Sequence, residues 1–207
     1  MIQFVKQALK DIHHTGSVWP SSRALAASMT RSLRNADGPR RILEVGPGTG
    51  PFTRVILRAM RDGDELDIVE INEGFCEHLE THFLSDHRER HPERVVRLHR
   101  KPVEEAELTP GYDFIVCGLP FNNFPPQLVR SIMRSLMGLL APGGEFAYFE
   151  YAGVRRMKAP FIGRDGRDRL GRINAHGRRM ARRNDGRREL VVANFPPAVA
   201  IRLTRAD

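Results

Sequence analysis

The sequence has little of what marks secreted, membrane-spanning or metal-binding proteins. It contains only two cysteines among 207 residues, Cys76 and Cys117, too few for the disulfide framework of a small secreted domain. No apolar run approaches the roughly 20 residues of a membrane-spanning helix, and the first residues lack the apolar core of a signal peptide. The Cys and His residues are scattered without zinc-site spacing, so we predict no metal site. A reduced, cytoplasmic protein is therefore expected.

Charge is unevenly distributed along the chain. The 33 Lys and Arg residues outnumber the 25 Asp and Glu residues, which gives a net charge of +8. Residues 154–188 hold 13 Lys and Arg against three Asp, a local net of +10, so the remainder carries a net of −2. Such a segment attracts phosphate, on nucleic acid or on an anionic membrane. A solvated Arg-rich surface is the plainer alternative.

Short apolar runs alternate with amphipathic stretches from about residue 40 onward. Runs rich in β-branched and aromatic residues predict strands, and apolar residues three and four apart predict helices. The alternation predicts an α/β fold with a mostly parallel, seven-stranded sheet, helices on both faces and an antiparallel strand near the C-terminal edge. The predicted strands are 42–45, 66–70, 94–102, 112–118, 145–151, 188–195 and 198–205, and the predicted helices are 51–60, 74–84 and 127–140.

An N-terminal helical extension, residues 1–38, precedes this domain, which spans 39–207 and carries the basic segment 154–188 as an insert. Residues 1–14 form a sharply divided amphipathic helix at about 100° per residue, which either packs on its own domain or lies in a lipid interface. A lid-like second helix is predicted over 21–34, with Ser21 or Ser22 as its N-cap. The apolar half of the first helix comprises Met1, Phe4, Val5, Ala8, Leu9 and Ile12.

The stretch "EVGPGTG" places Gly46, Gly48 and Gly50 at a strand-to-helix turn. Glycines there let backbone N–H groups approach a ligand closely. The spacing differs from the G-x-G-x-x-G dinucleotide pattern, because the third glycine of that pattern is missing. Glu70 ends the second predicted strand, where an acid can accept hydrogen bonds from both ribose hydroxyls. A surface carboxylate without a ligand is the alternative for Glu70.

Three stretches together resemble a known class of enzyme. "LEVGPGTG", Glu70 and "YDFIVCGLPFNNF" are similar to S-adenosylmethionine-dependent methyltransferases of the Rossmann-like class. More narrowly, "VWPSSRALAASM" and "CGLPFNNFP" resemble bacterial phospholipid N-methyltransferases (phosphatidylethanolamine N-methyltransferases). The resemblance implies S-adenosylmethionine as cofactor, S-adenosylhomocysteine as product, and methylation of phosphatidylethanolamine and its mono- and dimethyl derivatives toward phosphatidylcholine. It also implies a peripheral protein on the inner face of the cytoplasmic membrane, with no transmembrane span and no nucleic acid partner.

The resemblance also implies roles for single residues around the cofactor. Glu70 would bind the ribose and Ile71 would pack on the adenine. The residue near the adenine after the third strand stays open among Pro102, Val103 and Glu104. The methionine end would face Glu44 and the loop of Gly46, Pro47, Gly48 and Gly50, and the sulfonium end would be lined by Cys117, Gly118 and Leu119.

Aromatic side chains are the candidates for the methyl acceptor's pocket, because aromatic faces tolerate added methyl groups and attract the growing cation. We favour Trp19, Phe121 and Tyr151, which lie at predicted strand ends or loops, whereas Phe124 and Tyr148 fit core packing better. The proton acceptor stays open among Glu150, His13 and His14. Contacts to the lipid head group or the membrane are expected from Ser21, Ser22, Arg23, Asn122, Asn123, Arg155, Arg156, Arg178 and Arg179.

Two other functions compete with lipid methylation. Ribosomal RNA adenine dimethyltransferases share the plan of this sequence but carry Asn-Leu-Pro-Tyr at the corner where this chain has Gly118 and "LPF". The missing Asn amide argues against a base as substrate, although an RNA or protein methyltransferase could use the Arg-rich segment to bind phosphate. A catalytically silent cofactor-binding adaptor is a third possibility, made weaker by the complete set of loop glycines and Glu70.

Overall fold

The computed structural model describes residues 21–35, 37–152 and 185–206. The predicted amphipathic helix 1–14, Trp19, and Arg155, Arg156, Arg178 and Arg179 of the basic segment lie outside these residues. The helical elements are α2 (Arg23–Met29), η1 (Ser32–Asn35), α3 (Pro51–Ala59), α4 (Glu73–Leu79), η2 (Glu80–Leu84), α5 (Ser85–Arg90), η3 (Val103–Glu105), η4 (Phe121–Asn123) and α6 (Pro126–Leu139). The strands are β1 (Arg41–Val45), β2 (Glu65–Val69), β3 (Val95–His99), β4 (Tyr112–Cys117), β5 (Leu140–Tyr151), β6 (Arg187–Val191) and β7 (Ala198–Thr204).

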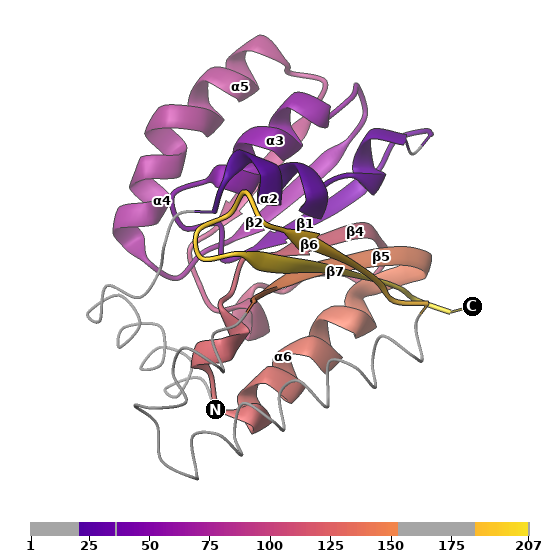
Figure 1. Cartoon of the computed structure of the whole chain (residues 1–207). Helices are drawn as coiled ribbons and strands as arrows, with labels where there is room; N and C mark the ends of the chain where they lie inside the picture. The colour runs from indigo at the N-terminus through magenta and orange to yellow at the C-terminus, as the bar shows by residue number, and fades with distance from the viewer. Residues whose placement is uncertain (1–20, 36, 153–184, 207) are drawn as a thin grey trace, which may run out of the picture.

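The strands form one seven-stranded sheet in the order β3-β2-β1-β4-β5-β7-β6. Every pairing among β1 to β5 is parallel, and β7 alone is antiparallel to both of its neighbours. The predicted Rossmann-like α/β fold with an antiparallel strand near the C-terminal edge is therefore confirmed. In Figure 1, α6 covers one face of this sheet and α2 and α3 lie on the other.

Each face of the sheet has its own hydrophobic core, because side chains alternate along a strand. In β1, Leu43 and Val45 join the core beneath α6, whereas Ile42 joins the core beneath α2 and α3. Glu44 lies between Leu43 and Val45 in the strand, so its side chain faces the α3 side of the sheet, where it is fully buried. Among the described residues, no helix is long and apolar enough to cross a bilayer.

Several helices and strands begin or end at other residues than predicted. The helix predicted over 74–84 runs on through α4, η2 and α5 to Arg90, because the chain has no Gly or Pro to stop it before Pro92. Its middle turn, η2, is a π-helix. Strand β5 begins at Leu140 instead of residue 145, and an irregularity opposite Tyr112 and Phe114 absorbs the extra residues.

The helix predicted over 21–34 is shorter and lies against the sheet. Ser22 is its N-cap and accepts from the N–H of Leu25, as predicted. The helix stops at Met29, where the hydroxyl of Thr30 bonds the carbonyl of Ala26, and the chain then tightens into η1. The buried residues Leu25 and Met29, with Ala26, belong to the core beneath α2 and α3. This helix is thus part of the folded core.

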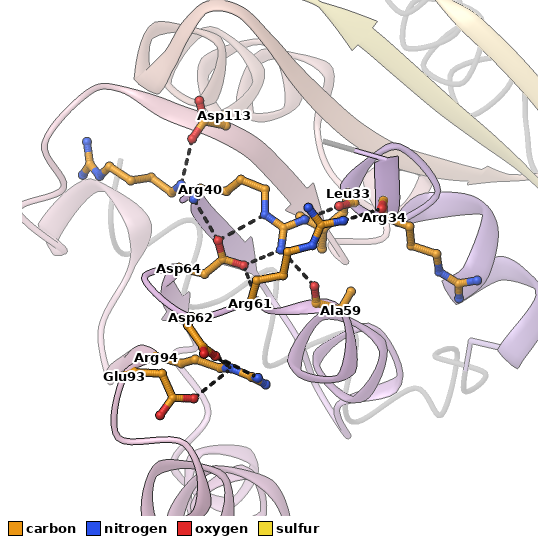
Figure 2. Close-up of polar contacts among 11 residues, drawn as sticks. Leu33, Arg34, Arg40, Ala59, Arg61, Asp62, Asp64, Glu93, Arg94 and Asp113 are labelled. Atoms are coloured by element: carbon orange, nitrogen blue, oxygen red, sulfur yellow. Dashed lines mark hydrogen bonds and ion pairs between the residues drawn. The ribbon is translucent and has the colours of Figure 1, made fainter. Parts of the chain in front are cut away.

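A buried ion pair joins the elements at the end of the sheet where β1 and β2 begin (Figure 2). Arg40 and Asp64 are 2% and 0% exposed. The arginine's backbone N–H and Nε donate to Asp64 Oδ1 at 2.8 and 3.1 Å, and its Nη2 pairs with Oδ2. Its guanidinium also donates to the carbonyls of Leu33 and Ala59, so it ties η1 and the end of α3 to the sheet.

The charge state of this pair follows from its hydrogen bonds. Burial by itself would raise the pKa of Asp64, but the hydrogen bonds from Arg40 and from the backbone N–H groups of Arg61 and Arg40 outweigh it and lower that pKa. Asp64 is therefore an ionised carboxylate in the interior, fully matched by donors. This pair is structural, and it lies at the opposite end of the strands from the glycine loop.

Candidate cofactor and substrate site

Three segments meet where the parallel strands end: the loop after β1, the end of β2 and the corner after β4. The N–H of Gly46 donates to the carbonyl of Val69 at 2.9 Å, and the N–H of Gly118 donates to the carbonyl of Val45 at 2.8 Å. These two bonds extend the sheet pairing by one residue and hold the loops side by side. In open α/β sheets this edge is where ligands bind.

The glycine loop and the β4 corner approach so closely that neither accepts a side chain. A Cβ on Gly118 would lie 2.3 Å from the carbonyl oxygen of Gly46, and a Cβ on Gly46 would lie 2.4 Å from the side chain of Leu119. A Cβ on Gly48 would meet no atom within 4 Å. The loop is thus closed against the corner on one side and open at Gly48, where a ligand can reach the backbone.

Glu70 is held at the mouth of this site. It is 6% exposed, and its carboxylate accepts from the backbone N–H groups of Ile71 at 2.8 Å, Asn72 at 2.9 Å and Gly48 at 3.2 Å. The longest of the three bonds crosses from β2 to the glycine loop. A diol entering the loop would compete for that same oxygen, which is the geometry expected of a ribose acceptor. Ile71 follows directly and is partly exposed.

Glu44 carries a buried carboxyl group whose loss of water is not compensated by hydrogen bonds. Neither of its oxygens has a hydrogen-bond partner among the residues that the structure describes. Burial raises its pKa to about 8, and Glu70 adds to the rise, although the hydroxyl and N–H of Thr53 lie close enough to lower it in part. The hydroxyl of Thr53 is itself without a hydrogen-bond partner among the described residues. A buried acid in this state is suited to a cationic ligand.

Glu44 should make the stability of the ligand-free protein fall as pH rises. Its pKa is raised from 4.5 to about 8 on folding, so the folded state binds more protons than the unfolded state across that window. The free energy of unfolding should therefore drop by roughly 3–4 kcal/mol between about pH 5 and about pH 8. Urea unfolding of the wild type and of Glu44→Gln at both pH values measures this difference. An equal change in the free energy of unfolding between the two pH values in both proteins would contradict this prediction.

The predicted sulfonium end is formed by the last residue of β4 and the corner that follows. Cys117 is fully buried, and burial raises the pKa of its thiol to about 12, so it serves as packing and not as a thiolate. Leu119 is 7% exposed and covers the glycine loop. Asn122 and Asn123 lie in η4, both partly exposed. Val103, in η3, packs against the α6 core, beside buried Pro102 and exposed Glu104.

Of the favoured aromatic candidates, the two that the structure describes, Phe121 and Tyr151, do not come together. Phe121 follows the corner, but its ring is only 1% exposed and packs in the α6 core. Its ring centroid lies 5.7 Å from that of Tyr148 and 6.4 Å from that of Phe124. Tyr151 packs on the opposite face of the sheet, edge-on to Phe149 at 5.3 Å. Phe121 is buried although it follows a loop, because η4 packs against β5, and its role at the acceptor stays a prediction.

Tyr148 carries a signal that periodicity does not reveal. It is 1% exposed, and its hydroxyl has no partner among the described residues. It pairs in register with Cys117, so it lies beside the corner. A tyrosine in a strand of otherwise apolar inward residues, where phenylalanine would serve the packing, is the only sequence hint of this buried polar group.

Comparisons with known proteins agree with this geometry. A family model of a methyltransferase domain matches residues 43–146. An ornithine lipid N-methyltransferase from Singulisphaera acidiphila is 31% identical over 135 residues, which are 63% of this chain and 67% of that protein. A ribosomal RNA small subunit methyltransferase A from Thermosynechococcus vestitus is 30% identical over 122 residues, 58% of this chain and 42% of that protein.

The fold also matches solved structures. An O-methyltransferase from Bacillus cereus, in complex with SAH, superimposes with a TM-score of 0.60 at 15% identity and covers 98% of this chain and 91% of that one. At this identity the likeness concerns the fold. The chain spans about two thirds of the lipid methyltransferase and less than half of the ribosomal RNA methyltransferase.

Proposed function

This chain belongs to the methyltransferase-domain family, and we propose that it methylates the amine of a lipid head group at an anionic membrane surface. The methyl donor is S-adenosylmethionine and the product is S-adenosylhomocysteine. The acceptor is phosphatidylethanolamine, followed by its mono- and dimethyl derivatives, and the enzyme acts from the inner face of the cytoplasmic membrane. The similarity to an ornithine lipid N-methyltransferase supports the acceptor class, since both lipids present a primary amine.

One observation carries the choice of an amine over a nucleobase. Position 118, where adenine dimethyltransferases of similar plan have Asn, is occupied here by a glycine whose Cβ would lie 2.3 Å from a backbone oxygen. No side chain fits there, so no side-chain amide can hold an adenine amino group at this point. A lipid amine needs no recognition by a side-chain amide, because the membrane surface holds the head group next to a bound enzyme.

The site's residues fit S-adenosylmethionine. The buried carboxyl of Glu44, without a hydrogen-bond partner among the described residues, suits the cofactor's ammonium group. Glu70 suits the ribose hydroxyls, and the open side of Gly48 leaves its backbone accessible. When bound, the sulfonium supplies the transferable methyl group. The chain contributes mainly by positioning the acceptor against that methyl, because in-line displacement needs alignment more than acid or base chemistry.

The acceptor must be neutral to attack. An alkylammonium has a pKa near 10, as in lysine, so the site has to favour the loss of a proton, which an apolar surrounding does. The aromatic group of Phe121, Phe124 and Tyr148 lies beside the corner and provides such a surrounding. In this proposal Phe121 shapes the acceptor side from within the core, and Trp19 and Tyr151 remain candidates for the entrance. The N–C bond forms as the S–C bond breaks, and the amine proton leaves to solvent.

The decisive experiment uses labelled S-adenosylmethionine with liposomes of phosphatidylethanolamine, with and without phosphatidylglycerol. Label in mono-, di- or trimethylated lipid is expected, with more label when the anionic lipid is present. A parallel arm with ornithine lipid separates the two amine-bearing lipids. Intact cofactor binding without label in either lipid would overturn the proposal.

RNA methylation is the second candidate, favoured by the similarity to ribosomal RNA methyltransferase A and by the Arg-rich segment 154–188. Label transferred to RNA and not to lipid would select it. Transfer to no acceptor, with the cofactor bound, would leave the adaptor role.

A further inference from the structure

The turn between β6 and β7 exposes apolar side chains where turns are normally polar. Residues 192–197 read "VANFPP", and turns usually expose Gly, Asn, Asp or Ser. Here Val192 is 72% and Phe195 is 70% exposed, and Leu190, at the end of β6, is 60% exposed. The one other large apolar side chain exposed among the described residues is Val95, at 39%. Three of the four therefore gather at one turn.

The turn is held rigidly with these side chains outward. Its only polar side chain, Asn194, is 2% exposed. The amide oxygen of Asn194 accepts from the N–H of Ser22 at 2.8 Å, and its Nδ2 donates to the carbonyl of Pro196 at 2.7 Å. The carbonyl of Pro197 accepts from the N–H of Ala152. The amide of Asn194 is thus hydrogen-bonded inside the protein, and the side chains that the turn exposes are apolar.

The turn lies at the functional end of the molecule. β6 is antiparallel to β7, which is antiparallel to β5, so β6 ends at the same edge of the sheet as β1, β4 and the glycine loop. Figure 1 shows the turn at the end of the β6–β7 hairpin away from the C-terminus. Val95, by contrast, starts β3, at the far side of the sheet and at the opposite end of the strands.

Charge around the turn matches an anionic lipid surface. Arg23, one residue after the serine bound to Asn194, is exposed. Arg187 and Arg188 are also exposed, but they begin β6, at the end of that strand away from the turn. A cation such as Arg23 beside an exposed apolar tip suits the boundary between anionic head groups and acyl chains. A stable protein interface would need about 800 Å² from each partner, far more than one turn offers. A lipid interface has no such requirement.

We propose that the β6–β7 turn, with Val192 and Phe195 at its tip, inserts into the lipid interface and holds the catalytic edge of the sheet against the membrane. This inference rests on the proposed lipid methyltransferase function. Ser22, which bonds Asn194 of the turn, follows the predicted amphipathic helix 1–14 in the sequence after only residues 15–21.

The test compares Val192→Asp/Phe195→Asp with the matched control Val95→Asp in sedimentation with vesicles of phosphatidylethanolamine and phosphatidylglycerol. The tip variant should bind at least tenfold more weakly, whereas the control should bind like the wild type. Calorimetric S-adenosylhomocysteine binding should be unchanged in both, which shows that the site is folded. Vesicle binding by the tip variant equal to that of the control would overturn the inference.

A milder pair of variants guards against misfolding. Phe195→Trp should show a blue shift of its emission on these vesicles and Val95→Trp should not, with Trp19 as a common background. The same response from both variants would refute insertion.

Methyl transfer separates this inference from the proposed function. The tip variant should lose transfer to vesicles but keep transfer to short-chain phosphatidylethanolamine dispersed as monomers. A wild type that binds vesicles through the tip but labels no lipid would overturn the proposed function alone.

Discussion

Gly118→Ala will reduce methyl transfer and S-adenosylhomocysteine affinity by at least a hundredfold. Its Cβ would lie 2.3 Å from the carbonyl oxygen of Gly46, a distance that two such atoms do not adopt. Both atoms belong to backbone that is pinned, Gly118 by the carbonyl of Val45 and Gly46 by that of Val69. The glycine loop must therefore move away from the corner, and the cofactor's binding surface moves with it. Calorimetry and an initial-rate assay measure the two losses.

Gly138→Ala is the matched control, because it makes the same chemical change in α6. A Cβ at Gly138 would meet nothing within 4 Å, so the helix should gain roughly 0.5–1 kcal/mol from the better helix former. Thermal unfolding of both variants distinguishes a local displacement of the loop from a general loss of fold. A Gly118→Ala protein with wild-type cofactor affinity would show that the loop and the corner yield easily.

Asp64→Ala will destabilise the protein by about 3–5 kcal/mol, because it leaves the guanidinium of Arg40 buried without a counter-ion. That loss is a large part of the 5–15 kcal/mol typical of a whole domain. Arg40 also holds the carbonyls of Leu33 and Ala59, so η1 and the end of α3 should loosen together. Urea unfolding at pH 7 measures the change.

A neighbouring pair provides the control for this prediction. Asp62 bonds Arg94 at 3.2 Å and is 74% exposed (Figure 2). An exposed pair of this kind contributes about 0–1 kcal/mol, so Asp62→Ala should leave the unfolding midpoint almost unchanged. The double variant Arg40→Met/Asp64→Leu should recover part of the stability, since it removes both buried charges together but leaves the backbone groups that they bonded without partners. Similar effects of Asp64→Ala and Asp62→Ala would show that the buried pair has no special role.

The succession of strands along the chain and the cofactor loop could be predicted because they depend on local patterns. Alternating apolar runs mark each strand, and Gly46 and Glu70 follow strand ends directly in the sequence. Parallel strands bring their ends to one edge of the sheet, so residues that follow β1, β2 and β4 have to meet there. The N-cap at Ser22 could be predicted for the same reason, because a cap depends on residues three positions apart.

The acceptor side could not be predicted in the same way. Phe121 and Tyr151 both lie near strand ends in the sequence, yet they pack on opposite faces of the sheet. Which face a loop residue takes depends on how the chain turns after the strand, and no period describes that. The π-helical turn η2 within the long helix could not be predicted either, because the sequence has no local signal that distinguishes such a turn.

The sequence by itself determined the α/β fold, the glycine loop, the acid at the end of β2 and the uneven charge, since each depends on neighbours a few residues apart. Only the tertiary structure decided which groups are buried together. Arg40 meets Asp64 across 24 residues, and Ser22 meets Asn194 across 172. The second contact turns Asn194 inward and leaves Val192 and Phe195 outward, and this makes an ordinary hairpin turn a candidate membrane tip. Side-chain direction at a turn is set by such distant partners, because local backbone preferences leave several directions open.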